Sequence, residues 1–599
     1  LVPTLTFSTN PTTITAGQSA TLTWSTTNAT SCSAGNGWSG TKATSGNQTI
    51  TPSQTTTYTL MCTGAGGSTT KSITVSVGGG ETVTQWAPHV LSLTSAQTLS
   101  WSSFPVQATF THPQSGTSLT LDGYWDGGNT WRVRFAPTRT GTWEWTTSSN
   151  DSGLNSKSGT LSAVAPSANE IFANPNYRGH VKVNGRYFTY ADGTPYFLLG
   201  DTNWNMVSSN TTPGDELDRW IADRKGKGFT AVMTRFMSDR EFPGEGGKLP
   251  FYGGGRIDVN DAYFRDVDER VLYIWGQGLV VMGHPDWIMG GSAFTLDEGI
   301  NISRYLLARF GAYNIIWSLT GEFQYAAENN NHWFWNNYAD TRALGNAVKA
   351  HNPYGHPVSI HPGGCGGDSA STLGGCGGSS SYFHNEGWLD HNWIQTHFTW
   401  EAIPGTMREA YDRSPAKPVI QAEPCYEGAP SGWSPWYGNR GACTTYLARM
   451  QGWISMLSGA IGYVYGAQGL FYADDWNALS LPGSTAIGYM KNFFTALPEW
   501  WLMTPTVDCV RINGSNPVST DMSHPRCAGV SGVWYAAYLP QDVNGTVQLR
   551  NIVTGTYRAR WFNPRSGEYT TINNSLSASG LWTIPARPDS NDWVVIIDK

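Results

Sequence analysis

The sequence predicts a multidomain protein in which a (β/α)8 TIM barrel is flanked by β-sandwich domains, two N-terminal and one C-terminal. Three observations carry this prediction. The length of 599 residues is too great for a single hydrophobic core. In residues 170–503, continuous apolar runs alternate with helical stretches. On both sides of that region, apolar and polar residues alternate in short segments between Gly- and Thr-rich turns, as in antiparallel sandwiches.

Each segment outside the barrel predicts its own sandwich. Residues 1–80 contain "ATLTWSTTNATSCSA" and "QTTTYTLMCTG", whose strand spacing and paired cysteines indicate an immunoglobulin-like fold. Residues 81–169, with "WRVRFAPTRTGTWEWTT", predict a second sandwich, and residues 504–599, with "TVQLRNIVTGTYRARWFNP", predict a third. We therefore expect four domains, the third of which is the barrel.

The barrel prediction rests on eight apolar runs, most of them preceded by a helical stretch. A strand that is apolar throughout must be covered on both faces, which is the position of a parallel strand between a barrel interior and a helix layer. The runs are "YFLLGDTNW" (196–204), "FTAVMTRF" (229–236), "LVVMGHPDW" (279–287), "NIIWSL" (314–319), "HPVSIHP" (356–362), "NWIQTHFTW" (392–400), "KPVIQAE" (417–423) and "GAIGYVYGAQ" (459–468).

The eight cysteines fall into local pairs, each inside one predicted domain. No CxxC motif and no Cys/His spacing typical of zinc sites occurs among them. An even number of locally paired cysteines indicates disulfides and an oxidising compartment, so we expect a secreted protein. The expected bridges are Cys32–Cys62, Cys365–Cys376, Cys425–Cys443 and Cys509–Cys527.

The composition and charge of the chain indicate which kinds of molecule it can bind. The net charge is −7 without a basic block, and there is no run of about 18 apolar residues, so we expect neither nucleic-acid nor membrane binding. Charged residues make up 14% and aromatic residues 13%, with 28 Trp. Aromatic rings stack on the C–H faces of sugars, so this balance is compatible with a carbohydrate partner as well as with aromatic sandwich cores.

Polar or aromatic side chains stand at the end of every predicted barrel strand. In a (β/α)8 barrel the carboxyl ends of the strands form the functional face, so these residues are candidates for one site. In strand order they are Asp201, Asn203 and Trp204; Arg235; His284, Asp286 and Trp287; Glu322; His361; His397 and Trp400; Glu423 and Tyr426; and Tyr465 and Gln468.

Glu322 and Glu423 are the candidate catalytic pair, since they close the fourth and seventh strands on nearly opposite sides of the barrel mouth. Glycoside hydrolysis needs one carboxylic acid to protonate the leaving oxygen and a second carboxylate on the other side of the anomeric carbon. We expect Arg235, His397 and Tyr465 to hold Glu423 ionised, and the pair to lie about 5–5.5 Å apart, as a retaining mechanism requires.

The motifs "PYFLLGDTNWNM", "GFTAVMTRFM", "YLLARFGAYNIIWSLTGE" and "KPVIQAEPCYEG" resemble the apiosidase-like barrel of glycoside hydrolase family 140 over residues 175–503. The tail motif "RWFNPRSGEY" resembles the collagen-binding-type domain that follows such barrels, and residues 1–80 resemble modules of secreted bacterial enzymes. The resemblance implies hydrolysis of apiose-containing side chains of the pectin rhamnogalacturonan II, with Glu423 as nucleophile and Glu322 as acid/base.

Two features depart from the family pattern. Where the family has "LGGD" this chain has "LTGE", so the carboxyl group of Glu322 reaches about one bond further than an aspartate would. A Gly/Ser insertion, "HPGGCGGDSASTLGGCGGSSS", follows the fifth strand and either shapes the cleft or forms a surface loop. Trp204, Trp287, Trp400 and Trp433 are candidate stacking platforms for sugar rings or residues of the core.

His284 and Asp286 lack a third ligand at metal-site spacing, so we expect them to bind sugar hydroxyls, with no metal and no cofactor. The main alternative is an endo-β-glycanase acting on glucan or xylan. A non-catalytic carbohydrate- or collagen-binding protein is the alternative from another class, and the presence of both carboxylates counts against it. We expect a monomer whose partner is a polysaccharide or oligosaccharide substrate.

Overall fold

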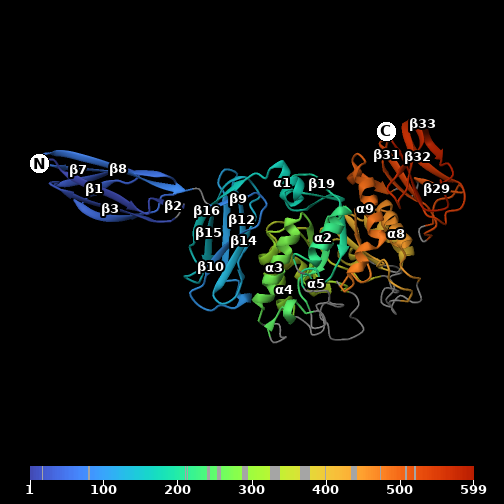
Figure 1. Ribbon diagram of the computed structural model, residues 1–599, viewed down its shortest axis with the longest axis horizontal. Helices are drawn as coiled ribbons and strands as arrows, with labels where there is room; N and C mark the ends of the chain where they lie inside the picture. The colour runs from blue at the N-terminus through green and yellow to red at the C-terminus, as the bar shows by residue number, and fades with distance from the viewer. Residues whose placement is uncertain are drawn as a thin grey trace. The chain divides into compact units, whose positions relative to one another are not determined.

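Figure 1 shows the computed structural model of the chain, which divides into two compact units, Leu1–Ser167 and Ala168–Lys599. The structure describes residues 1–15, 18–78, 81–208, 211, 213–238, 243–252, 258–285, 295–323, 338–364, 378–397, 399–432, 441–472, 474–505, 509–518 and 521–599.

The first β-sandwich of the N-terminal unit has sheets of order β1-β3-β6 and β2-β8-β7-β4-β5. Along β3 the alternate side chains of Ala20, Leu22 and Trp24 are buried, as the period of a strand with one covered face requires. The strands are β1 (Thr4–Asn10), β2 (Thr13–Thr15), β3 (Ala20–Thr27), β4 (Ser31–Asn36), β5 (Gly40–Lys42), β6 (Ser45–Ile50), β7 (Thr56–Gly64) and β8 (Gly67–Gly78).

The second β-sandwich has sheets of order β10-β14-β13 and β12-β11-β15-β16-β9. Phe110 of β11 and Phe135 of β14 join the sheets by stacking, with ring centroids 3.9 Å apart. The strands are β9 (Glu81–Thr84), β10 (His89–Thr94), β11 (Val106–His112), β12 (Thr117–Asp122), β13 (Tyr124–Trp125), β14 (Thr130–Phe135), β15 (Gly141–Ser149) and β16 (Ser158–Val164).

The second unit contains the predicted (β/α)8 barrel. Its eight parallel strands follow the order β24-β23-β22-β21-β20-β27-β26-β25 and are buried throughout. This confirms the prediction that the continuous apolar runs are parallel strands covered on both faces. The strands are β20 (Leu198–Thr202), β21 (Ala231–Arg235), β22 (Val280–His284), β23 (Ile315–Ser318), β24 (Val358–Ser359), β25 (Asn392–His397), β26 (Val419–Pro424) and β27 (Gly462–Tyr465).

Helices separate these strands along the chain. Asn260 and Thr444 cap α3 and α8 through their side chains, and Thr295 and Glu298 form a capping box on α4. The principal helices are α2 (Glu216–Gly226), α3 (Asp261–Gly276), α4 (Leu296–Phe310), α5 (Tyr338–Ala350), α6 (Ser379–Phe383), α7 (Ile403–Asp412), α8 (Thr445–Leu457) and α9 (Pro482–Thr495). Before the barrel lie α1 (Ala168–Ala173) and the small sheet β17 (Lys182–Asn184), β18 (Tyr187–Thr189) and β19 (Pro195–Tyr196).

An antiparallel sheet follows the barrel, in the order β28-β30-β31-β34-β32-β29, with β33 paired to β32. Its apolar face encloses a core of its own that includes Trp561, Trp593 and the Cys509–Cys527 disulfide. The strands are β28 (Thr504–Pro505), β29 (Val510–Ile512), β30 (Arg526–Val530), β31 (Trp534–Leu539), β32 (Val547–Phe562), β33 (Tyr569–Thr583) and β34 (Trp593–Asp598).

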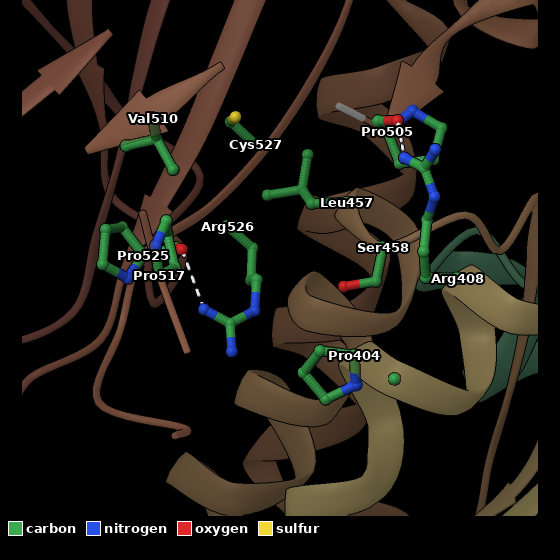
Figure 2. A pocket seen from close by; sticks show the side chains of 11 residues that line it. Pro404, Arg408, Leu457, Ser458, Pro505, Val510, Pro517, Pro525, Arg526 and Cys527 are labelled. Carbon is green, nitrogen blue, oxygen red and sulfur yellow. Dashed lines mark hydrogen bonds between the residues drawn. The ribbon is translucent and has the colours of Figure 1, made fainter. Parts of the chain in front are cut away.

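Helix α8 lies between the barrel and this C-terminal sheet, and every residue from Ala448 to Leu457 is buried. Trp453 stacks on Tyr538 of β31, and the Arg449 guanidinium makes two hydrogen bonds of 2.8 Å to the Asp592 carboxylate. A pocket at the same interface is lined by residues of α7, of the end of α8 and of the sheet, among them Arg408, Ser458 and Arg526 (Figure 2).

The fold class predicted from the sequence is confirmed: a TIM barrel with β-rich domains on both sides. Three of the predicted disulfides, Cys32–Cys62, Cys425–Cys443 and Cys509–Cys527, are present. Cys365 and Cys376 lie outside the described residues. In the part of the chain that the structure describes, no helix is long and apolar enough to cross a membrane.

Candidate active site

The barrel places Glu423 inside β26 through an irregular pairing with β25. Gln395 pairs with Glu423 although Ile394 pairs with Gln421, so Ala422 is an extra residue on β26. A bulge of this kind changes which face of the sheet the next side chain occupies. Glu423 is 3% exposed and lies beside His361, one of the histidines at the barrel mouth.

Three side chains surround the Glu423 carboxylate. Tyr426 donates a hydrogen bond of 2.8 Å from its hydroxyl to Oε1. The Nε2 atom of His361 lies 3.2 Å from Oε2, and the Nε2 atom of His397 lies 3.7 Å from Oε1. Tyr426 is itself held by the indole N–H of Trp204, which lies 3.3 Å from the tyrosine hydroxyl oxygen. The hydrogen bond from Tyr426 orients the Glu423 carboxylate and favours its charged form against the effect of burial.

Glu322 lies in the turn after β23, and among the described residues its carboxylate has one hydrogen-bond donor, Gln395. Glu322 is half-buried, and its φ of 41° is in the left-handed region that non-glycine residues seldom occupy. Gln395 donates a hydrogen bond of 2.9 Å from Nε2 to Glu322 Oε1. Since Gln395 also pairs with Glu423 through the backbone, one residue of β25 is tied to both carboxylates.

Both carboxyl groups bind their protons more tightly than a carboxyl group in water. Burial and the nearby negative charge of Glu423 raise the pKa of Glu322 to about 8, while the hydrogen bond from Gln395 lowers it. Burial raises the pKa of Glu423 to about 8 as well, and the hydrogen bond from Tyr426 opposes that rise. Because the charge of Glu423 contributes to the raised pKa of Glu322, we place a single proton shared by the pair on Glu322.

Three buried histidines line the same end of the barrel and are neutral. Burial lowers the pKa of His361 to about 3, and burial together with His361 lowers that of His397 to about 3. Burial and His361 hold the pKa of His284 well below its usual value. The ring of His361 stacks between those of Trp204 and Trp393, at centroid distances of 5.9 and 5.1 Å. Neutral imidazoles provide dipoles at the site without adding charge.

Asp201 and Tyr465 lie on the other face of the barrel wall, so their predicted roles at the substrate side do not fit their placement. The Asp201 carboxylate accepts hydrogen bonds from Trp220 (3.1 Å) and Arg224 (2.5 Å) of α2. The Tyr465 hydroxyl donates to Glu427, not to Glu423. The two residues pair across β20 and β27, and paired residues of a parallel sheet point to the same side.

Other predicted residues support the strand ends. Arg235 donates to the Asn205 side-chain oxygen at 2.8 Å, and the Asn203 side-chain oxygen accepts the Asn205 backbone N–H at 3.2 Å. Trp204 is 2% exposed and packs against His284 and His361, so it forms a wall of the site. Trp400 is half-buried in the short helix η7 (Trp400–Ala402).

Some of the predicted site residues fall in segments that the structure does not describe. Asp286, Trp287 and Trp433, and the part of the Gly/Ser insertion from 365 to 377, lie outside the described residues. Among the residues that are described, no group of three or more His, Cys, Asp or Glu side chains is arranged to hold a metal ion.

Gln395 was missed in the prediction from sequence. The signal was present, because "NWIQTHFTW" interrupts an apolar strand with a glutamine two positions before His397. An amide at that position can donate to a carboxylate, but only the pairing of β25 with β26 brings it to Glu322.

The chain matches three family models. Residues 182–501, more than half of the chain, match the apiosidase-like catalytic domain. Residues 82–150 match a domain of unknown function, and residues 518–598 match a model described as "Putative collagen-binding domain of a collagenase". A sequence comparison with curated proteins gives no match.

Solved structures of glycoside hydrolases share the fold. A "putative glycoside hydrolase" from Bacteroides vulgatus ATCC 8482 has a TM-score of 0.63 at 19% identity, covering 87% of this chain and 100% of that one. A family 5 glycoside hydrolase from the same organism has a TM-score of 0.59 at 20% identity, covering 71% and 94%. A third structure, titled "Glycoside hydrolase", has a TM-score of 0.59 at 20% identity, covering 71% and 98%.

At these identities the structural likeness establishes the fold alone. The apiosidase-like match spans all eight barrel strands, including the ends that carry Glu322 and Glu423. The chain therefore belongs to the apiosidase-like family of glycoside hydrolases.

Proposed function

We propose that the protein is a retaining glycosidase in which Glu423 is the nucleophile and Glu322 the acid/base. The observation that carries this proposal is the unequal environment of two adjacent carboxyl groups. Glu423 accepts a hydrogen bond from Tyr426 that favours its charged form and lies beside two neutral imidazoles, whereas the negative charge of Glu423 adds to burial in raising the pKa of Glu322. Pairs of carboxyl groups with different proton affinities are how glycosidases divide the two roles.

In the first step a Glu423 carboxylate oxygen bonds to the anomeric carbon as the bond from that carbon to the leaving oxygen breaks. Glu322 gives its proton to the leaving oxygen, so the product departs as an alcohol. In the covalent intermediate Glu423 is an ester without charge. The negative charge that raised the pKa of Glu322 is then gone, and Glu322 becomes the carboxylate that takes a proton from water. The resulting hydroxide bonds to the anomeric carbon and releases Glu423.

For the substrate, we propose a plant cell-wall polysaccharide, and within it the apiose-containing side chains of rhamnogalacturonan II. Membership of the apiosidase-like family supports this choice. We also propose that the protein is secreted as a four-domain chain with domains 1–80, 81–169, 170–503 and 504–599. The three disulfides support an oxidising compartment.

The test is to incubate the purified full chain with rhamnogalacturonan II, xylan and β-glucan, and to identify the products by mass spectrometry. Release of apiose or of apiose-containing oligosaccharides from rhamnogalacturonan II is the expected result. Cleavage of xylan or glucan alone would overturn the substrate and favour an endo-glycanase. The anomer formed first, followed by proton NMR, tests the mechanism: net retention is expected, and inversion would overturn the role of Glu423 as nucleophile.

A further inference from the structure

A third carboxylate close to the site has no part in the mechanism above. Glu427 lies four residues after Glu423 and directly after Tyr426, and it is 1% exposed. A buried carboxylate is costly unless several donors hold it, so such a group needs an explanation.

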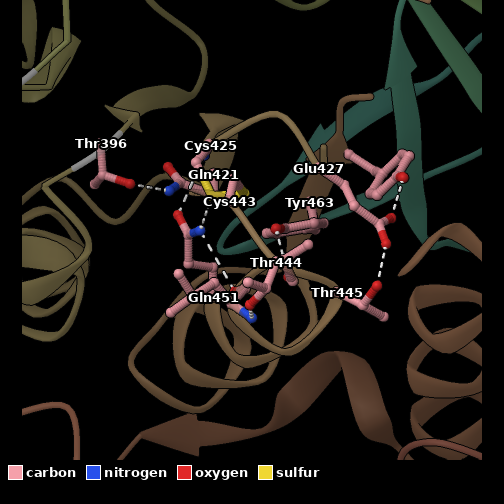
Figure 3. Close-up of a disulfide and its surroundings, with 12 residues drawn as sticks. Thr396, Gln421, Cys425, Glu427, Cys443, Thr444, Thr445, Gln451 and Tyr463 are labelled. Atoms are coloured by element: carbon pink, nitrogen blue, oxygen red, sulfur yellow. Dashed lines mark hydrogen bonds between the residues drawn. A yellow bond between two sulfur atoms is a disulfide. The ribbon is translucent and has the colours of Figure 1, made fainter. Parts of the chain in front are cut away.

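Three donors from three different elements meet the Glu427 carboxylate. Tyr465 at the end of β27 donates its hydroxyl hydrogen. Thr445 at the start of α8 donates from Oγ1 at 2.6 Å (Figure 3). The backbone N–H of Gly483, in the first turn of α9, donates at 3.0 Å. The N-terminal end of a helix carries a partial positive charge, which further favours an anion there. Glu427 therefore joins β27, α8 and α9 at one point.

Two glycines permit this arrangement. A Cβ atom on Gly483 would lie 2.2 Å from Oε2 of Glu427, and a Cβ atom on Gly466 would lie 2.0 Å from the Tyr426 ring. Both distances are far below a van der Waals contact, so any larger residue would displace the side chain that lies against it. Glu427 and Tyr426 thus each occupy a space that exists because a glycine faces them.

The backbone fixes the same turn. The Glu427 N–H donates to the Gly466 carbonyl at 2.9 Å, and the Gln468 N–H donates to the Glu427 carbonyl at 2.8 Å. Tyr426 stands between this fixed point and Glu423, with its ring stacked on Phe471 at 4.8 Å. The residue that donates the hydrogen bond to Glu423 is therefore the direct neighbour, along the chain, of the anchored Glu427.

We propose that Glu427 is a positioning residue for the nucleophile: its carboxylate anchors the 425–429 turn to β27, α8 and α9 and so sets the hydrogen bond from Tyr426 to Glu423. This proposal rests on the assignment of Glu423 as nucleophile. It implies that Tyr465, Thr445 and Gly483 act on catalysis only through Glu427.

The test compares two variants, Glu427→Gln and Gly483→Ala. The first removes the negative charge of residue 427; the second keeps that charge but displaces the carboxylate, because the added methyl group occupies its space. For both variants we expect kcat to fall by about 10- to 10²-fold, as small misplacements at a reacting group do, with KM little changed on rhamnogalacturonan II oligosaccharides. Tyr465→Phe removes one donor of three and should show a smaller fall, which keeps the test open if Glu427→Gln does not fold.

The pH profile separates positioning from stability. Among the described residues, the charged and titratable groups that face Glu423 are Glu322, His361, His397 and Tyr426. If the Tyr426 hydroxyl moves away, the charged form of Glu423 loses a donor and the acid limb of kcat/KM should move to higher pH.

Asp592→Asn is the matched control, because Asp592 is a 1% exposed carboxylate that also accepts bonds from a charged or polar set including a tyrosine hydroxyl. It should lower Tm without changing kcat or the acid limb. If Glu427→Gln and Gly483→Ala behave like Asp592→Asn, with wild-type kcat and an unmoved acid limb, the proposal is overturned.

A crystal structure of Glu427→Gln gives a readout that needs no substrate: we expect the distance from the Tyr426 hydroxyl to Glu423 Oε1 to exceed the 2.8 Å of the wild type. An unchanged distance would also overturn the proposal. Full activity of Glu423→Gln, in contrast, would overturn the proposed function and leave the Tyr426 geometry as a separate result.

Discussion

The turn after β26 and the turn after β23 each carry one of the two carboxylates, and they are built differently. The β26 turn is joined to its surroundings by the Cys425–Cys443 disulfide, by Gln451 of α8, which donates to Cys425 Sγ at 2.8 Å, and by Glu427 (Figure 3). The β23 turn bends through a left-handed Glu322 whose carboxylate receives a hydrogen bond from Gln395.

The difference matches the two tasks. A nucleophile must stay charged and stay in line with the anomeric carbon, which rigid donors achieve. An acid/base must gain and lose a proton in every cycle, so its charged form must not be held by many donors. Among the described residues, Glu423 has the Tyr426 hydroxyl and two imidazoles beside it and Glu322 has the Gln395 amide, a difference that supports opposite roles for two residues of the same type.

The largest expected effect is that of Glu423→Gln. An amide cannot form the glycosyl ester, so activity should fall by about 10⁴-fold or more on every substrate, as when other enzymes lose their nucleophile. The measurement is kcat/KM on both an aryl glycoside and a polysaccharide. Residual activity above about one per cent on either would remove the distinction between the two turns.

Glu322→Gln should have a smaller effect that depends on the substrate. Without a proton donor, cleavage of a natural linkage should slow by about 10²- to 10⁴-fold. A leaving group that departs without protonation, such as a nitrophenolate, should leave the first step nearly intact. Added azide should restore turnover by replacing the water that needs a base. Equal losses on both substrate types, without azide rescue, would contradict the assignment.

The smallest effects are those of the supporting donors, and the two should move opposite limbs of the pH profile. Gln395→Leu removes a donor that favours charged Glu322, so the pKa of Glu322 should rise and the basic limb of kcat/KM should move to higher pH. Tyr426→Phe removes a donor from charged Glu423, so the acid limb should move to higher pH. Shifts of the same limb in both variants would show that the two turns titrate as one.

The sequence predicted which residues stand at the strand ends but not which face of the wall each one occupies. Asp201 and Tyr465 share a register position on β20 and β27, and both point into the helix layer, as strand alternation requires. Successive side chains of a strand point to opposite faces, so a residue next to Gly200 or Val464 points away from the face that those two occupy. This alternation alone would have predicted that Asp201 and Tyr465 point into the helix layer. The same alternation would have given the wrong face for Glu423, because the extra residue Ala422 interrupts the alternation just before it.

The supporting residues were harder to predict for a different reason. Gln395 and Glu427 act through partners that lie 73 and 38 residues away along the chain, Glu322 and Tyr465. Such partners meet only after the strands have paired, so no local pattern identifies them. The apolar runs, in contrast, encode burial residue by residue, which is why the barrel itself could be predicted.

Helix α8 makes the barrel a poor candidate for excision. Its outer side is covered by the C-terminal sheet, where Trp453 meets Tyr538 and Arg449 meets Asp592. A chain shortened to end at Met503 would expose that apolar side to water and leave a guanidinium without its carboxylate, on the helix whose first residue, Thr445, binds Glu427. In engineered fusions, the barrel and the C-terminal sheet should therefore be kept together as one unit. The domain boundary suited to exchanging modules is the junction between Ser167 and Ala168.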